Sequence, residues 1–170
     1  WLCAPNITNV LTDFRRTGTY DRNCEFHMTA SPSMAILISS NLGRLLHALL
    51  GGDSTAVAAR MDSLAKTGRY SVSEVMLARL QSEFYGGFCD EAGTAETVRE
   101  TWVNYEYLAD THTAVGLAVR EQYLRETGDT TKTIVASTAN PYKFTGSILT
   151  ALRGVPSDAD EFAQAEQLAK

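Results

Sequence analysis

The sequence predicts a helix-rich α/β protein, in which a small and mostly parallel sheet is flanked by helices. Residues 132–138 are enriched in β-branched side chains and lead directly into a helix opened by Pro141. Residues 1–4 form a short apolar stretch that is typical of a strand. The sequence between them is mainly amphipathic helix without repeats or a linker, so residues 1–170 are expected to form a single domain.

Four helices are expected in the first half of the chain. The first ends at Gly18, a residue that suits the left-handed conformation closing many helices. The second carries a stripe of leucines after Ser40, which can serve as its N-cap, and Ser73 can cap the fourth. The expected ranges, in order, are 8–17, 40–51, 54–66 and 73–83.

The second half alternates possible strands with longer helices. Residues 84–90 combine a glycine pair with aromatic side chains, which indicates a short strand or an extended turn. Thr94 is expected to cap one helix, and Asp110 a longer one that closes at Gly128. The strand at 132–138 and helices at 141–153 and 157–170 complete the prediction. The inner face of the helix after Thr94 is expected to consist of Val98, Trp102 and Tyr105.

Composition excludes several classes of function. The chain has 170 residues, 44% of them hydrophobic, and a net charge of -5, with scattered Lys and Arg, which argues against nucleic-acid binding. No apolar run approaches the roughly 20 residues of a membrane helix, so we expect a cytoplasmic protein that contacts no membrane. The cysteines are odd in number and lack Cys-x-x-Cys spacing, so we expect reduced thiols and no metal site.

The stretch Val135-Ala-Ser-Thr-Ala-Asn-Pro-Tyr-Lys-Phe144 is the best candidate for a ligand site. It places hydroxyls, an amide and one lysine where a strand is expected to meet a helix. A helix start offers free N–H groups and the positive end of the dipole, and ligands collect at the carboxyl ends of strands in open α/β sheets. An anionic or polar ligand is therefore favoured at this junction.

Four segments, in order, give the chain a family resemblance. They are Asn6-Ile-Thr-Asn-Val-Leu-Thr-Asp-Phe-Arg-Arg-Thr-Gly-Thr-Tyr20, Ser31-Pro-Ser-Met34 with the following 36–46, Asp110-Thr-His-Thr-Ala-Val-Gly116, and the junction. With these the sequence resembles threonine synthase, a pyridoxal-phosphate enzyme of the tryptophan-synthase-β-like superfamily. The resemblance covers nearly the whole chain, to about Leu152.

The resemblance implies a fragment of a three-layer α/β/α enzyme of fold type II. Its reaction would convert O-phospho-homoserine and water to threonine and phosphate. The Schiff-base lysine and the glycine-rich loop that holds the cofactor phosphate would precede Trp1, so no catalytic residue is expected within the chain. The chain alone is then expected to be inactive, to bind no pyridoxal phosphate, and to self-associate through apolar faces.

The resemblance also assigns roles at the junction. Thr138 would meet the pyridine nitrogen of pyridoxal phosphate, with Ser137 as the alternative, although a hydroxyl here could equally be an ordinary strand end. Lys143 would join the N–H groups of a helix start in holding the substrate phosphate, or else would be a solvated surface lysine. Its use as the Schiff-base lysine is rejected, because the helix dipole disfavours an amine in a first turn.

His112, Thr113 and Asn140 are further candidates for substrate binding. His112 and Thr113 open a helix that could line the same crevice, although a lone histidine is more often structural. Asn140 stands where many family members have histidine. Ala35, Gly43 and Thr111 also depart from the family pattern, so no role tied to those side chains transfers.

Two alternative functions stay open, and the departures at Ala35, Gly43 and Asn140 favour the second of them. One is another fold type II pyridoxal-phosphate lyase or dehydratase, acting on serine or threonine. The other is a non-catalytic binding module that has retained the family core.

Overall fold

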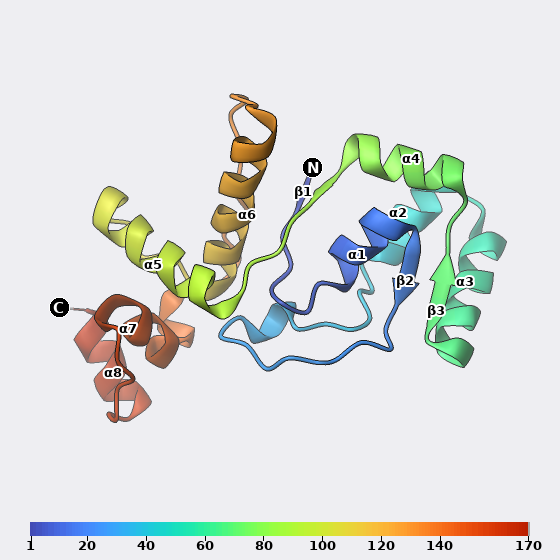
Figure 1. The fold of residues 1–170 in the computed structure, drawn as a ribbon. Coiled ribbons are helices and arrows are strands. Elements are labelled where there is room, and N and C mark those ends of the chain that lie inside the picture. The colour runs from blue at the N-terminus through green and yellow to red at the C-terminus, as the bar shows by residue number, and fades with distance from the viewer. Residues whose placement is uncertain (170) are drawn as a thin grey trace.

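Two groups of helices lie at opposite ends of an elongated molecule, with a short parallel sheet between them (Figure 1). The computed structural model describes residues 1–169. Each group has its own apolar core, one built by residues 10–84 and one by residues 95–168. We refer to them as the N-terminal and C-terminal lobes.

The N-terminal lobe is organised around α1 (Val10–Thr17), which buries Val10 and Phe14. Its end at Gly18, with a φ of 74°, confirms the predicted stop, while its start lies two residues later than predicted. Directly after it, β2 (Thr19–Asp21) pairs antiparallel with β3 (Arg69–Ser71), a sheet that the sequence did not predict.

Three further helices complete this lobe and confirm the predicted series. The predicted cap at Ser40 is wrong: Asn41 occupies the N-cap of the second helix and makes no side-chain capping bond. Ser73 does cap the last one, accepting from the N–H of Met76. The helices are α2 (Leu42–Leu49), α3 (Ser54–Thr67) and α4 (Glu74–Glu83), and a 3-10 turn, η1 (Pro32–Met34), precedes them.

The two lobes meet at a parallel pair of two-residue strands. Leu2 of β1 (Leu2–Cys3) lies opposite Tyr85 of β4 (Tyr85–Gly86), and Cys3 lies opposite Gly86. A strand was predicted in the first segment and a short strand or an extended turn in the second; the structure has a strand in each. The pairing joins residues more than 80 positions apart in the sequence.

The C-terminal lobe begins with α5 (Glu91–Tyr105), whose orientation differs from the prediction. Asp90, and not Thr94, caps this helix by accepting from the N–H of Gly93. The buried face is Thr94, Val98 and Thr101. Trp102 and Tyr105 are exposed, so their predicted place on the inner face is wrong.

Helix α6 (Thr111–Thr127) follows the prediction closely. Asp110 caps it by accepting from the N–H groups of His112 and Thr113, and the helix ends at Gly128 with a φ of 68°. Helices α5 and α6 lie against each other and form the wall of the lobe. Val98, Ala114, Ile148 and Ala151 form the core between them and the last helices.

The last third of the chain corrects three predictions. Residues 132–138 form no β ladder with any strand within residues 1–169, because no neighbouring strand lies beside them. The helix expected at 141–153 is a 3-10 turn, η2 (Pro141–Lys143), followed by α7 (Thr145–Arg153). The last helix, α8 (Glu161–Leu168), is capped by Asp160 and starts four residues later than expected; its predicted end at 170 lies outside the described residues.

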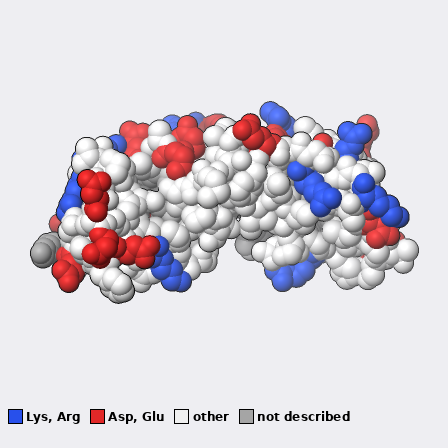
Figure 2. Space-filling view, turned by 90° about the horizontal axis from the view of Figure 1, so that it is seen from below, with Lys and Arg blue, Asp and Glu red and all other residues white. Residues whose placement is uncertain are grey.

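The helix-rich α/β class is therefore confirmed, with one parallel and one antiparallel pair of strands. Figure 2 shows one face of the molecule, on which acidic side chains predominate at the C-terminal lobe and Lys and Arg at the opposite end. A broad uncharged region separates them. None of the helices within residues 1–169 is both long enough and apolar enough to cross a membrane.

Candidate functional site

The residues from Thr138 to Lys143, at the end of the extended segment and just beyond it, include three exposed polar side chains. Thr138 is exposed, and its hydroxyl forms no hydrogen bond within residues 1–169. The side chain of Asn140 accepts from the N–H of Tyr142 at 2.9 Å and so caps η2. Lys143 is exposed and lies in η2, ahead of α7 and not within its first turn. The described chain gives it no ion pair, so its ammonium group is available to an anion.

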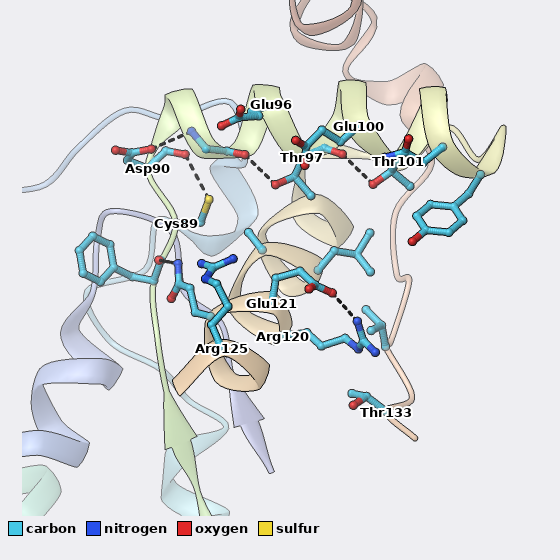
Figure 3. A pocket seen from close by; sticks show the side chains of 18 residues that line it. Cys89, Asp90, Glu96, Thr97, Glu100, Thr101, Arg120, Glu121, Arg125 and Thr133 are labelled. Carbon is cyan, nitrogen blue, oxygen red and sulfur yellow. Dashed lines mark hydrogen bonds and ion pairs between the residues drawn. The ribbon is translucent and has the colours of Figure 1, made fainter. Parts of the chain in front are cut away.

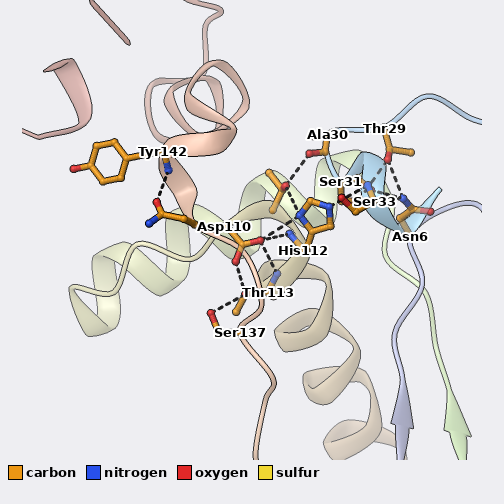
Figure 4. Close-up of polar contacts among 12 residues, drawn as sticks. Asn6, Thr29, Ala30, Ser31, Ser33, Asp110, His112, Thr113, Ser137 and Tyr142 are labelled. Carbon is orange, nitrogen blue, oxygen red and sulfur yellow. Dashed lines mark hydrogen bonds and ion pairs between the residues drawn. The ribbon is translucent and has the colours of Figure 1, made fainter. Parts of the chain in front are cut away.

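Ser137, in contrast, is held by two side chains. Its hydroxyl oxygen lies 3.1 Å from the hydroxyl of Tyr107. It also lies 3.1 Å from the hydroxyl of Thr113 (Figure 4). Tyr107 belongs to the loop between α5 and α6, and Thr113 to the first turn of α6. Ser137 thus has partners on two other elements, while its neighbour Thr138 has none in the described chain.

Asp110 is the acceptor at the centre of this arrangement. Its side chain is 1% exposed, and it accepts from the hydroxyl of Thr113 at 2.5 Å and from the N–H groups of His112 and Thr113 at 2.9 and 3.2 Å. A carboxylate that is withdrawn from water needs such donors, because an unpaired buried charge is costly. The cap residue of α6 therefore also organises the hydroxyls beside it.

His112 is fixed as one neutral tautomer by its surroundings. Its Nε2 accepts from the backbone N–H of Ser33 at 3.2 Å, so the ring proton resides on Nδ1, which faces the Asp110 carboxylate at 3.2 Å. The ring is 6% exposed and packs against Phe144, with centroids 4.8 Å apart. Both ring nitrogens are occupied, so His112 has a structural role in this arrangement.

The loop at 29–33 is attached to α6 and to the start of the chain by further polar contacts (Figure 4). The hydroxyl of Thr111 donates to the carbonyl of Ala30 at 2.7 Å. Asn6, fully buried, donates to the hydroxyls of Thr29 and Ser31 and accepts from the N–H of Thr8 at 3.0 Å. The network of Figure 4 therefore extends from Asn6 in the N-terminal lobe to Ser137 in the C-terminal lobe.

The structure divides the six predicted site residues into two groups. Three of them use their polar atoms within the described chain: His112 and Thr113 contact Asp110, and Ser137 contacts Thr113. The other three occupy the exposed stretch that follows: Thr138, Asn140 and Lys143.

Two contributors to the site were not assigned by sequence reasoning. Asp110 was predicted only as a helix cap, although a carboxylate two residues before a histidine and three before a threonine indicates a shared acceptor. Tyr107 carried no sequence signal, because nothing in the spacing shows that it lies beside Ser137.

A separate groove of about 920 Å³ lies between α5 and α6 (Figure 3). It is lined by charged side chains, among them Glu96, Glu100, Arg120 and Glu121, of which the last two form an ion pair. A second cavity, of about 490 Å³, lies between α5 and α7. None of the six predicted site residues lines either one, although Val135, at the start of the junction stretch, lines the groove.

Comparison with known proteins places this geometry in one family. A family model described as the C-terminal part of threonine synthase matches residues 113–170. The threonine synthase-like 1 protein of Macaca fascicularis is 35% identical over 154 residues, which is 90% of this chain and 20% of that protein.

Two solved structures share the fold. Pyridoxal-phosphate-bound threonine synthase from Brucella melitensis superposes with a TM-score of 0.81 at 32% identity, over 97% of this chain and 35% of that one. Yeast threonine synthase gives a TM-score of 0.84 at 29% identity, over 99% of this chain and 36% of that one. The chain thus spans about a fifth to a third of the length of these relatives. It belongs to the threonine synthase family.

Proposed function

We propose that this chain is the C-terminal part of a threonine synthase that converts O-phospho-homoserine and water to threonine and phosphate, with pyridoxal phosphate as its cofactor. The observation that carries the proposal is the exposed Thr138 hydroxyl, which has no hydrogen-bond partner within residues 1–169. The preceding residue, Ser137, is hydrogen-bonded to Tyr107 and Thr113. Membership of the family and the pyridoxal phosphate in the Brucella melitensis relative support it.

The residues present fit pyridoxal phosphate in one respect: they offer an accessible hydroxyl for its ring nitrogen. A hydroxyl that contacts the ring nitrogen must be accessible and free, and Thr138 meets both conditions, whereas Ser137 is already bonded. Thr138 would therefore hold the ring nitrogen through a neutral group. Bound pyridoxal phosphate supplies an electron sink for negative charge at the substrate carbon.

Lys143 is the residue of this chain that would bind the phosphate group of the substrate. It is exposed, cationic and five residues beyond Thr138, and its backbone N–H is already used by the carbonyl of Asn140. Its contribution would therefore come from the ammonium group, which acts as a point charge towards phosphate oxygens. Asn140 would contribute less, since its side-chain oxygen caps η2.

The isolated chain is expected to show no activity. The predicted site residues lie outside both cavities, on an open surface such as one wall of a cleft would present. Lys143, the lysine of the junction, is assigned here to the substrate phosphate, so the amine that transfers protons to and from substrate carbon would come from elsewhere in the longer protein. Activity is therefore a property of the longer protein, in which the cofactor lysine and phosphate loop would complete the site.

The test uses the full-length protein that carries this chain. We expect phosphate release from O-phospho-homoserine, together with a visible absorption band of bound pyridoxal phosphate that borohydride abolishes. Lys143→Met should raise the KM for O-phospho-homoserine about tenfold, the effect of losing one charge-assisted contact, with a smaller change in kcat. Lys132→Met, at an exposed lysine outside the junction, serves as the control and should leave KM unchanged.

Two results would contradict the proposal in different ways. Turnover of serine or threonine with no response to the phosphorylated substrate would indicate a lyase or dehydratase of the same fold. Absence of both the visible band and any turnover would indicate a binding module that has lost its chemistry. The threonine synthase assignment requires phosphate-dependent turnover.

A further inference from the structure

The segment 132–139 is attached to the rest of the molecule by few interactions. No backbone hydrogen bond joins it to another element within residues 1–169. Val135 packs near Gly116 of α6, where an added Cβ would lie 3.4 Å from it. The remaining attachment is the Ser137 hydroxyl, which reaches Tyr107 and Thr113. The place of Thr138 therefore depends on what holds Ser137.

The protons of these hydroxyls have a defined order. A carboxylate can only accept, so the 2.5 Å contact takes the single hydroxyl proton of Thr113 towards Asp110. The proton between Thr113 and Ser137 then comes from Ser137, and the Tyr107 hydroxyl donates to the oxygen of Ser137. This order gives the hydroxyl oxygens of Thr113 and Ser137 one defined donor and one defined acceptor each, which fixes the Ser137 rotamer.

His112 holds the carboxylate in place from the other side. Its Nδ1–H faces the oxygen of Asp110 that also accepts the N–H groups of His112 and Thr113, while Nε2 is tied to Ser33. The second carboxylate oxygen is thereby left to Thr113. One carboxylate oxygen of the buried Asp110 therefore caps α6, and the other accepts from the hydroxyl of Thr113.

We propose that Asp110, acting through Thr113 and Ser137, is a positioning residue that sets where the Thr138 hydroxyl stands for the ring nitrogen of pyridoxal phosphate. The proposal rests on the proposed function, because it concerns the same site. In this proposal Asp110, Thr113 and Tyr107 together hold Ser137, and through it they position the Thr138 hydroxyl towards the cofactor. None of the three touches the cofactor.

Substitutions in the full-length protein separate this role from stability. Thr113→Val removes the hydroxyl at nearly constant volume, and Thr113→Ser restores it. Asp110→Asn keeps a good N-cap residue, but its amide group would donate to Thr113 and so reverse the order of the hydroxyl protons. Thr101→Val is the matched control, since Thr101 is equally buried and its hydroxyl donates only within α5, to the carbonyl of Thr97.

Three readouts are measured on each variant: the dissociation constant of pyridoxal phosphate, the absorption maximum of the bound cofactor, and amide hydrogen exchange of residues 132–139 without cofactor. We expect Thr113→Val and Asp110→Asn to weaken cofactor binding about five- to tenfold, to shift the band, and to accelerate exchange in the segment. Thr113→Ser should match the wild type. Thr101→Val should lower the thermal midpoint and leave all three readouts unchanged.

The double variant adds a second criterion. If Asp110 acts through Thr113, the two substitutions together should weaken cofactor binding no more than either one alone. Additive effects would overturn the proposal, as would a Thr113→Val protein with wild-type cofactor affinity and exchange. If the wild type binds no pyridoxal phosphate, the proposed function fails and the positioning role fails with it. If the wild type binds it and releases phosphate while Thr113→Val is unchanged, only the positioning role fails.

Discussion

The rings of Tyr20 and Tyr70 stack across the antiparallel pair of β2 and β3, with centroids 5.3 Å apart and planes 2° apart. Phe14 of α1 meets both rings edge-on at 5.8 Å. The Tyr20 hydroxyl donates to the carbonyl of Leu37 and accepts from the N–H of Ser39, both at 2.9 Å. This aromatic group therefore joins the first helix, the sheet and the loop before α2.

Phe14→Ala tests how far the N-terminal lobe depends on that group. Phe14 is 2% exposed, so the substitution leaves a cavity and should cost about 3–5 kcal/mol of unfolding free energy. Phe162→Ala in α8 removes the same side chain at a site that is 86% exposed, and should cost less than about 0.5 kcal/mol. Urea unfolding of the two variants provides the comparison, and equal losses would show that the aromatic group is not the core of this lobe.

Glu106→Gly is expected to stabilise the protein. Glu106 closes α5 with a φ of 53°, the only positive φ at a non-glycine residue within residues 1–169. Glycine adopts this conformation without a Cβ penalty, so the gain should be up to about 1 kcal/mol. Glu100→Gly, in the exposed interior of the same helix, should instead lose about 1 kcal/mol, and thermal melting should give shifts of opposite sign.

The carboxyl group of Asp129 should titrate at unusually low pH. Hydrogen bonds from Thr131 and from the Tyr123 hydroxyl, the latter at 2.6 Å, lower the pKa of Asp129 to about 2. Because the folded pKa is depressed, the stabilisation is present above the unfolded pKa of about 3.9 and is lost as the pH falls towards 2. NMR titration of the carboxyl carbon measures this pKa. Tyr123→Phe should raise it, and Tyr105→Phe should not.

The three cysteines should differ in reactivity towards alkylating reagents. Burial raises the pKa of the Cys89 and Cys3 thiols, and less thiolate means slower attack. Cys24 is exposed and should react first, with Cys89 at least about tenfold slower under native conditions. Mass spectrometry after timed iodoacetamide treatment gives the order. Equal rates in native protein would contradict the burial of Cys89.

The isolated chain is expected to self-associate. Ile134 is 97% exposed on the unpaired segment 132–138, and Val103 and Tyr105 are exposed at the end of α5. An apolar side chain on an extended segment without a ladder favours pairing with another chain. Light scattering should show a concentration-dependent mass that Ile134→Lys reduces. A monodisperse monomer at high concentration would refute the expectation.

Local signals in the sequence predicted the parts of the fold that depend on local contacts. Gly18 and Gly128 end their helices as expected, and Asp110 and Ser73 cap theirs, because capping involves only residues within one turn. The cap of α5 was misplaced at Thr94, since Thr and Asp are both good cap residues; in the structure Asp90 is the cap and Thr94 is buried within the helix.

Contacts between distant residues account for what the sequence could not predict. The pairing of β2 with β3 joins three-residue strands 48 positions apart, and runs this short carry too little pattern to be recognised. Residues 132–138 have strand composition, but a ladder also needs a neighbour. The assignment of the junction as a ligand site stays a prediction, whereas the contact of Tyr107 with Ser137 emerged only in three dimensions.

Because Leu2 pairs with Tyr85, the parallel strand pair cannot form during synthesis until the chain has grown past Tyr85. Strand β1 is synthesised before its partner and stays unpaired until 83 more residues have been added, about 4–17 s at typical elongation rates of roughly 5–20 residues per second. During that interval α1 to α4 can pack around the aromatic group of Phe14, Tyr20 and Tyr70 while β1 is still unpaired. The pairing of β1 with β4 can therefore form only after the helices of the first lobe have been synthesised, and before those of the second lobe.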